Sequence, residues 1–293
     1  MTKNPYISRL KEKRENKYYM KKLTTLLLAI AIVVMPSCKN RSNNNTKEEA
    51  PDYAQASLES LTNEALKTDM ANLIESAKHI KAVPFLKAQK DGKISLSDKE
   101  KMVKPDFLVA PDVATGLVTL NQKYRAIGIL TSDKAIAELY EMPVASYSEN
   151  IFKLLTDIND PALMEFYTLP SFDIESNREA FSVFVDDEYA AGRINYFWEG
   201  VTAGLVEQLF ILTRNIDKFM PMFTDELASD ITYNFVCVHD GLTKTVNATP
   251  EMASLNEVLE PLYAINAISV EQLRTQLTDL KDEIEAARAA LLN

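Results

Sequence analysis

The chain has 293 residues, with 32 basic and 42 acidic side chains, a net charge of −10 and 46% hydrophobic residues. This acidic balance argues against nucleic-acid binding, which depends on many lysine and arginine contacts to phosphate. Seven glycines and two histidines occur, and the sequence contains no glycine-rich phosphate loop, nucleophile elbow or histidine zinc motif. We therefore expect no nucleic-acid partner, no cofactor and no bound metal.

The N-terminal part of the chain has the order of a secretory signal peptide. An apolar segment covers residues 23–35, thirteen positions, whereas a membrane-spanning helix needs about 20. Lys21 and Lys22 precede this segment and the small residue Ser37 follows it. Charged, apolar and small residues in this order are typical of a cleaved secretion signal.

The residues Met35-Pro36-Ser37-Cys38 end this segment and resemble the lipobox of bacterial lipoproteins. In that family, signal peptidase II cleaves before a cysteine that carries thioether-linked diacylglycerol. The resemblance implies a signal peptide over residues 1–37 and makes Cys38 the lipid attachment site. A short buried helix with an incidental cysteine is the alternative interpretation.

Two further features qualify the predicted leader. Met20 stands directly before two lysines, a conventional opening for a signal peptide, so translation from Met20 is an alternative to a long charged leader. Lys39, rather than an aspartate, follows the cysteine. In lipoproteins of Gram-negative bacteria this resembles an outer-membrane address, so we expect a lipid-anchored protein of the cell envelope.

Residues 38–53 are polar, rich in asparagine and contain a proline near their end, so we expect a disordered tether. Residues 1–37 hold 8 of the basic and 2 of the acidic side chains, which leaves 24 basic against 40 acidic residues, or −16. This charge argues against docking of the globular part onto anionic lipid.

Residues 54–293 predict one all-α domain, because apolar residues recur at steps of three and four. The run 232–238 is the one ambiguous segment, and Asp240-Gly241 after it favours a helix end with His239 in the last turn. We expect Cys237 to be buried. The predicted helices cover residues 55–82, 111–130, 132–141, 146–157, 161–168, 176–191, 193–219, 224–240, 250–266 and 269–292.

Helix starts are indicated by capping residues. Asp160 and Thr249 each precede a proline, Ser176 stands three residues before Glu179, and Ser269 three residues before Gln272. The last predicted helix carries a heptad seam that indicates a helix packed along its own domain, with a coiled coil as the alternative.

The segment 194–219 is predicted to be the central core helix. Its apolar residues, Trp198 among them, fall within one sector of the helix. Gly200 and Gly204 lie one turn apart, which allows another backbone to approach closely. We therefore expect Trp198 to be a core residue.

One internal similarity suggests that the domain consists of two related helical halves. Residues 113–118 (VATGLV) and 201–206 (VTAGLV) share a pattern at an offset of 88 residues, and each is expected to lie inside a helix. Chance similarity in a composition rich in alanine, leucine and valine is the alternative.

The densest mixture of aromatic and charged residues lies at 188–199, and this segment is the first candidate for a ligand pocket. The candidate ligand-binding residues are Arg193, Tyr196, Glu199 and Glu207. In the alternative interpretation, Phe197 and Trp198 fill the core and Arg193 pairs with a carboxylate. The run 186–188 (DDE) is interpreted as a solvated helix face.

Together these features favour a lipid-anchored, non-catalytic helical module that binds an envelope protein partner or supports an assembly. The alternative is a helical small-molecule or glycan-binding protein, or an enzyme without a recognisable motif. A concave site with paired carboxylates favours the alternative, and a large flat apolar patch favours the first.

Overall fold

The computed structural model describes residues 68, 71–80, 84–168, 177–245 and 250–293. The predicted signal peptide, Met20, the lipobox and the tether lie outside these residues, and so do the predicted capping residues Ser176 and Thr249. Within the described residues every regular element is a helix and no strand occurs, which confirms the predicted all-α domain.

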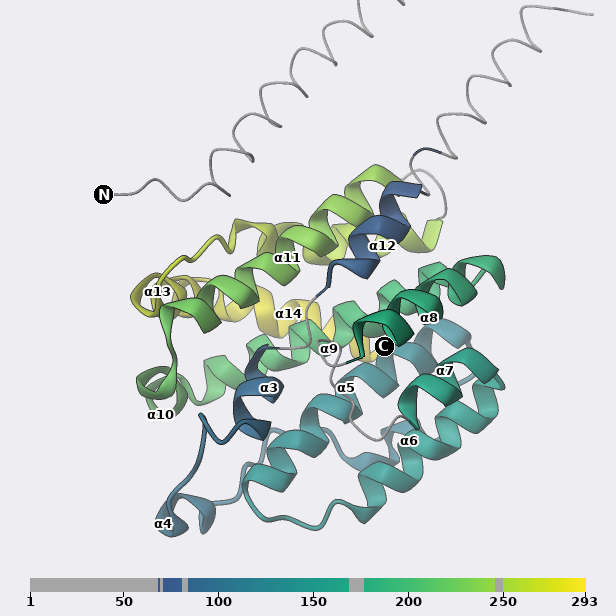
Figure 1. Cartoon of the computed structure of the whole chain (residues 1–293). Coiled ribbons are helices and arrows are strands. Elements are labelled where there is room, and N and C mark those ends of the chain that lie inside the picture. Colours follow the sequence, from purple (N-terminus) through teal and green to yellow (C-terminus); the bar gives the residue numbers. More distant parts are fainter. Residues whose placement is uncertain (1–67, 69–70, 81–83, 169–176, 246–249) are drawn as a thin grey trace, which may run out of the picture. The chain divides into compact units, whose positions relative to one another are not determined.

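Figure 1 shows the order of the helices along the chain. After a helical segment at 71–78, they are α3 (Pro84–Lys90), α4 (Asp98–Lys101), α5 (Leu120–Leu139), α6 (Ala145–Ile158), α7 (Pro161–Tyr167), α8 (Arg178–Ala190), α9 (Ile194–Arg214), α10 (Ile216–Phe219), α11 (Asp225–Thr245), α12 (Pro250–Leu259), α13 (Val270–Asp279) and α14 (Lys281–Leu292). Three 3₁₀ turns are interspersed: η1 (Pro111–Ala114), η2 (Met220–Met222) and η3 (Glu260–Ala264).

Helices α5 and α9 form the centre of the domain and touch through their backbones. A Cβ atom on Gly128 of α5 would lie 2.2 Å from the carbonyl oxygen of Gly200 in α9. A Cβ on Gly204 would lie 3.4 Å from the carbonyl oxygen of Gly128. The predicted close approach at Gly200 and Gly204 is confirmed, and its partner is a third glycine.

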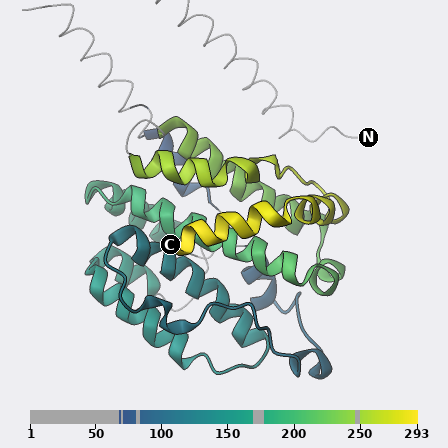
Figure 2. The same ribbon diagram turned by 180° about the vertical axis from the view of Figure 1, so that it is seen from behind.

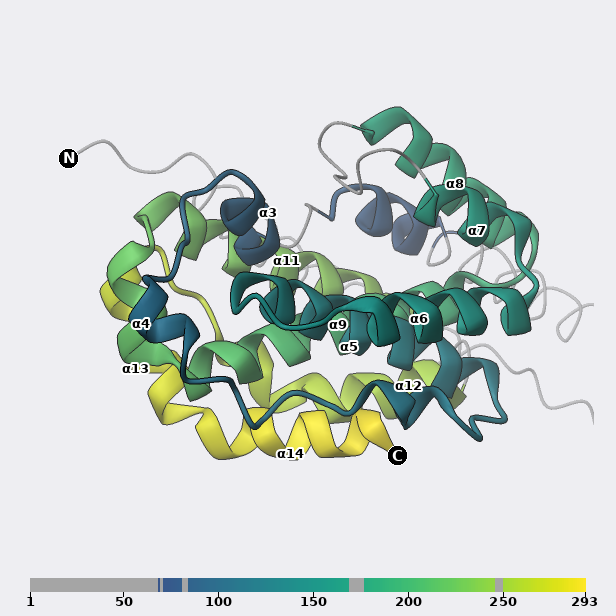
Figure 3. The same cartoon turned by 90° about the horizontal axis from the view of Figure 1, so that it is seen from below.

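The remaining helices surround this pair. Helix α6 packs on α5, α14 packs on both α5 and α9, and α7 packs on α8. Figures 2 and 3 show α14 running along the central pair, with α6 on another side of it. Helix α9 is therefore enclosed by neighbours, and residues 202–212 are all buried, as expected for the central core helix.

Trp198 is a core residue with 0% exposure, as predicted. Its ring is the inner end of a chain of aromatic contacts between α7, α8 and α9. The ring centroids of Phe197 and Trp198 lie 5.7 Å apart, those of Phe184 and Phe197 5.9 Å, and those of Phe166 and Phe184 4.8 Å.

Helix α11 continues beyond its predicted end. Gly241 lies inside the helix, where a Cβ would come within 2.8 Å of the Trp198 ring. This glycine therefore leaves room for the tryptophan and is not a cap. His239 consequently lies away from the last turn, with its ring 4.3 Å from that of Tyr263. Cys237 is buried, as expected.

The predicted division of residues 111–141 into two helices is wrong. The helix starts later, where Thr119 and Gln122 form a capping box, and runs unbroken to Leu139. Ser132 and Asp133 resemble a helix start in sequence but lie in its interior. Ser132 Oγ is 3.1 Å from the carbonyl oxygen of Gly128 in α5 and 3.2 Å from that of Gly204 in α9. Its hydroxyl is therefore within hydrogen-bond distance of both central helices.

Three predicted long helices are interrupted, and in one of them, 250–266, α12 ends at Leu259 and the 3₁₀ turn η3 follows. The segment 193–219 divides at Asn215, and the segment 269–292 divides at Leu280, whose φ and ψ of −100° and 16° are not helical. The heptad seam survives this break, because Leu273, Leu277 and Ile284 are all buried within the domain. The predicted N-caps Asp160 and Ser269 are confirmed.

The two similar segments 113–118 and 201–206 differ in structure. Residues 201–206 lie in the middle of α9, whereas residues 111–114 form the 3₁₀ turn η1 and Gly116 has φ of 85°. The expectation that each copy lies inside a helix is therefore wrong, and these segments provide no structural support for related halves.

The central contact predicts a graded response to alanine. Gly128→Ala places a Cβ 2.2 Å from a carbonyl oxygen that belongs to a helix backbone and cannot move aside, so we expect a loss of about 2–4 kcal/mol in the free energy of unfolding, as for other overpacked cores. Gly204→Ala is the matched control, because its Cβ sits at 3.4 Å and alanine favours the helix by about 1 kcal/mol. Urea denaturation measures both, and equal losses would contradict the close approach.

Candidate functional site

The charged residues of α9 are drawn into buried ion pairs with other helices. Glu199 is almost fully buried; its carboxylate accepts hydrogen bonds from Arg125 Nε at 2.6 Å and from Asn121 Nδ2 at 2.8 Å. Both donors come from α5. A carboxylate buried on a core helix is strongly disfavoured without such partners, so Arg125 neutralises the charge of Glu199 and Asn121 adds a hydrogen bond where α5 meets α9.

Glu207 lies about two helical turns further along and is held by a bidentate arginine. Arg288 of α14 donates from Nε to one carboxylate oxygen at 2.7 Å and from Nη2 to the other at 2.9 Å. Its guanidinium carbon lies 3.9 Å from the centre of the Phe210 ring, and Nη2 also donates to the carbonyl oxygen of Phe107. Arg288 therefore attaches the C-terminal helix to the core.

Asp133 of α5 shares this cluster. Burial, followed by the neighbouring charge of Glu207, raises the pKa of Asp133 to about 9, although its carboxylate accepts a hydrogen bond from the Val109 N–H. At neutral pH the cluster thus holds one guanidinium, one carboxylate and one protonated carboxyl. The buried charges cancel.

A second cluster has the same composition and surrounds Asp160. One oxygen of Asp160 caps α7 by accepting from the N–H groups of Ala162 and Leu163, at 3.0 and 3.3 Å. The other oxygen lies 2.7 Å from Arg193 Nη1 and 3.1 Å from the Tyr124 hydroxyl. Asp160, the predicted helix cap, is therefore also the ion-pair partner of Arg193. This agrees with the alternative interpretation, in which Arg193 pairs with a carboxylate.

Glu188 completes the second cluster. Its carboxyl is fully buried, 3.2 Å from the Tyr124 hydroxyl, and burial raises its pKa to about 9. Burial also opposes ionisation of Asp160, but hydrogen bonds from Glu188 and Arg193 outweigh it and lower the pKa of Asp160. Glu188 therefore holds the proton and donates it to Asp160.

This position corrects the interpretation of residues 186–188 as a solvated face. Asp186 is exposed and pairs with Lys78 at 2.5 Å, and Asp187 is exposed, whereas Glu188 faces the core. Three consecutive residues span about 200° of a helix, and the edge of this arc that holds Glu188 faces the buried Tyr124 hydroxyl.

The four candidate ligand-binding residues do not meet in one site. Arg193, Glu199 and Glu207 belong to three separate ion-pair clusters, and the Tyr196 ring packs against that of Tyr124 with centroids 5.7 Å apart. None of the four lines the open cleft between α7 and α8.

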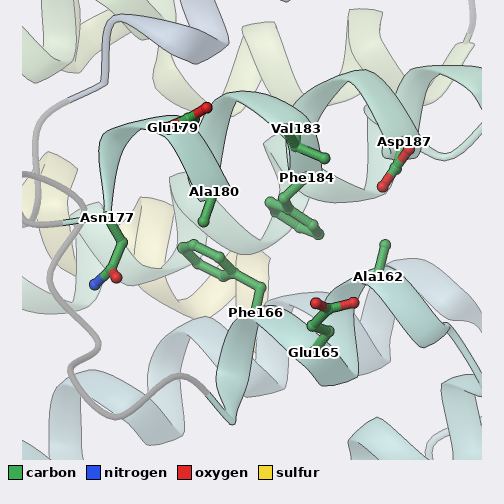
Figure 4. A pocket seen from close by; sticks show the side chains of 9 residues that line it. All are labelled: Ala162, Glu165, Phe166, Asn177, Glu179, Ala180, Val183, Phe184 and Asp187. Carbon is green, nitrogen blue, oxygen red and sulfur yellow. The ribbon is translucent and has the colours of Figure 1, made fainter.

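That cleft has a volume of about 460 Å³ and an aromatic floor (Figure 4). Phe166 of α7 stacks on Phe184 of α8 with an interplanar angle of 7°. Figure 4 shows Glu165 and Asp187 on opposite sides of the gap between the two helices. The lining residues are Ala162, Glu165, Phe166, Asn177, Glu179, Ala180, Val183, Phe184 and Asp187.

The cleft is negatively charged. Its carboxylates are those of Glu165, Glu179 and Asp187, and in the part of the chain that the structure describes no basic side chain lies within ion-pair distance of them. Val183 adds an exposed apolar side chain between them. Such a surface suits a group that combines positive charge with an apolar body.

Sequence reasoning missed this cleft, although a partial signal existed. Glu179, Val183 and Asp187 recur at steps of four, which places them on one face of α8. Nothing in that spacing shows that the face opposes α7. The pairing of α7 with α8 depends on the buried cluster in which the Tyr124 hydroxyl contacts both Asp160 and Glu188, and on the aromatic stack, and both are tertiary features.

Over the described ranges, no helix is both long and apolar enough to cross a membrane. Within the same ranges, no three histidine, cysteine, aspartate or glutamate side chains are grouped so as to hold a metal ion. No family model, curated protein or solved structure matches the chain.

The buried proton on Glu188 predicts a pH-dependent stability. Because its pKa rises from about 4.3 in the unfolded chain to about 9 in the folded chain, the folded state binds this proton more tightly. The free energy of unfolding therefore falls as the pH rises through this window, by up to about 1.4 kcal/mol per pH unit. In Glu188→Gln the side-chain amide still donates to Asp160, but the group no longer titrates. We therefore expect the free energy of unfolding of this variant, relative to that of wild type, to increase from pH 5 to pH 9.

Urea denaturation at pH 5, 7 and 9 measures this difference. Glu179→Gln, an exposed change in the same helix, is the control and should follow wild type at each pH. Asp133 titrates in all three proteins, so its contribution to the pH dependence of the free energy of unfolding cancels in the comparison. If the free energies of unfolding of Glu188→Gln and wild type change with pH in the same way, Glu188 is not protonated in the folded state.

Proposed function

We propose that the protein is a lipid-anchored lipoprotein of the bacterial cell envelope whose helical domain is a non-catalytic binding module. The observation that carries the binding role is the α7/α8 cleft, where an aromatic floor is surrounded by three carboxylates without basic partners among the described residues. Groups that are left unpaired at a surface are available to a partner.

The buried clusters support a structural role for the other charged residues. A general acid or base must come within about 3 Å of the proton that it transfers. Glu199 and Glu207 are almost wholly enclosed and already engaged by arginines. Their ion pairs stabilise the packing of α9 and do not face the cleft.

The partner that fits the cleft is a basic segment of another envelope protein. Its lysine or arginine side chains would meet Glu165, Glu179 and Asp187, and its apolar residues would cover Val183 and the aromatic floor. A small organic cation is the alternative occupant, because a concave site with several carboxylates is the feature that favours a small-molecule ligand and 460 Å³ lies within the range of such pockets, roughly 300–1,000 Å³. The open side of the cleft and the exposed Val183 favour the peptide.

The anchor proposal rests on the sequence alone. Cys38 would carry the lipid, and residues 38–53 would tether the domain with a mean reach of roughly 20 Å. The outer membrane is the proposed location, on the basis of Lys39.

The anchor is tested by Cys38→Ser. We expect wild type to incorporate a labelled fatty acid and to sediment with membranes, and the variant to lose the label because it lacks the thiol that accepts the lipid. Cys237→Ser is the control, since this buried cysteine is not part of the proposed anchor. Equal labelling of wild type and Cys38→Ser would defeat the anchor.

The cleft is tested with a short lysine- and leucine-containing peptide, its glutamate-containing counterpart and phenylethylammonium as probes. We expect the basic peptide to bind, the acidic peptide not to bind, and the double variant Glu165→Gln/Asp187→Asn to weaken binding roughly 3- to 10-fold, as two partly exposed ion pairs would. Isothermal titration calorimetry measures each affinity.

Glu149→Gln/Asp157→Asn, two exposed residues of α6 outside the cleft, is the matched charge control and should bind like wild type. Tighter binding of phenylethylammonium than of the peptide would favour the small-molecule alternative. Unchanged affinity in the cleft variant would place the binding surface elsewhere.

A further inference from the structure

Helix α4 and the turn after it carry two consecutive exposed apolar side chains. Met102 is 79% exposed and Val103 71% exposed. The other large apolar side chains exposed in the described ranges are not adjacent to one another in sequence: Val118, Phe152, Val183, Tyr189 and Ile268. We call residues 98–104 the tip.

The tip is ordered without being packed. None of the residues of α4 is buried. A complete capping box holds the helix: Glu100 N–H donates to Ser97 Oγ, and Ser97 N–H donates to the Glu100 carboxylate at 2.9 Å. In Figure 1 α4 stands at the margin of the domain. The chain therefore builds a fixed turn whose apolar residues serve no internal packing.

The charge around the tip is opposite to that of the domain. Residues 87–104 contain six lysines and three acidic residues, whereas residues 38–293 carry −16. Two of the three acidic residues are engaged locally, Asp91 with Lys87 at 2.9 Å and Glu100 in the capping box, and the third, Asp98, is exposed in the first turn of α4. Lys93 and Lys99 are exposed and have no ion-pair partner among the described residues. Lys99 belongs to the same short helix that precedes Met102, and Lys93 to the segment that leads into it, so the exposed lysines fall in the part of the chain that carries the two apolar side chains.

Two other lysines fix the orientation of the tip. Lys101 pairs with Glu141 at 2.6 Å, and the Lys104 ammonium donates to the carbonyl oxygen of Tyr140. Both acceptors lie at the end of α5. The tip is thereby held against the central helix while Met102 and Val103 point away from it into solvent.

From this arrangement we propose that the tip docks onto an anionic lipid surface, with Met102 and Val103 entering the headgroup region and Lys93 and Lys99 contacting the negative headgroups. Apolar side chains flanked by lysines are the composition of interfacial membrane-binding segments. The aliphatic stems of the lysines can lie along the boundary while their ammonium groups remain in water.

A lipid surface fits the tip better than a protein partner. A specific protein interface covers about 800 Å² on each partner, whereas the exposed apolar part of the tip is two side chains long. A lipid surface needs no complementary pocket. The acidic remainder of the domain would be repelled by the same surface, which selects the tip as the point of contact.

The net charge of the domain does not prevent this contact. Screening at physiological ionic strength limits the reach of each charge to about 8 Å, so the excess of lysine over acidic side chains in residues 87–104 acts where the tip meets the headgroups. The expectation that the acidic domain avoids anionic lipid therefore applies to its other faces. Figures 1 and 3 show α7 and α8 far from α4, so docking would leave the cleft accessible.

The test uses residues 38–293 with Cys38→Ser, which lack the predicted basic and apolar signal peptide as well as the proposed lipid and keep the buried Cys237 as the only other thiol. An environment-sensitive dye is attached at Val103→Cys or, as the control, at Val118→Cys, which replaces an equally exposed valine outside the tip. Vesicles contain either phosphatidylcholine alone or a mixture with phosphatidylglycerol. We expect a blue shift of the dye emission at position 103 on the anionic vesicles, and none at position 118.

The charge dependence is tested in the same labelled chain. Lys93→Glu/Lys99→Glu should abolish the blue shift, and Lys123→Glu/Lys153→Glu, which changes the net charge equally outside the tip, should preserve it. Far-UV circular dichroism verifies that each variant is folded. Equal responses at positions 103 and 118, no response on either vesicle, or a shift that survives in Lys93→Glu/Lys99→Glu would each overturn the proposal.

Discussion

The contact on which the rest of the domain depends is the backbone approach of α5 and α9. It exists because Gly128 faces Gly200 and Gly204, so that no side chain separates the two helices. At this distance the polar groups on the facing surfaces are removed from water, and a partner across the interface offsets the cost of burying them. Ser132, which bridges carbonyl oxygens of both helices, is the most direct example.

The buried ion pairs follow from this approach. Contacts advance along both helices together, from Arg125 with Glu199 to Asp133 with Glu207, so α5 and α9 run in the same direction. Where two acids meet one arginine, a retained proton removes the excess charge, as at Asp133 and at Glu188. The charges that would suggest chemistry in an open site here specify which helix packs on which, and Arg288 extends the same arrangement to α14.

Because these charged residues are buried, the surface of the domain carries two features of opposite charge. The cleft between α7 and α8 exposes carboxylates around the Phe166–Phe184 stack, and the tip after α4 exposes Met102 and Val103 beside lysines. They lie far apart on the domain (Figures 1 and 3). In the proposed arrangement, the tip and the lipid at Cys38 would fix the domain on a membrane and the cleft would face a basic partner.

The sequence by itself determined the all-α class, the central position of α9, the core role of Trp198 and the caps at Asp160 and Ser269, because these depend on periodicity and on hydrogen bonds between near neighbours. Only the tertiary structure decided that α5 is continuous through Ser132, that helices break at Asn215 and Leu280, and that Gly241 makes room for a tryptophan. The partners of Arg193, Glu199 and Glu207 were beyond the sequence for the same reason: they lie 33 to 81 residues away along the chain, and only packing brings them within 3 Å. The acidic residues of the exposed cleft and those of the buried clusters look alike in the sequence. They differ in whether an arginine from elsewhere in the chain packs against them.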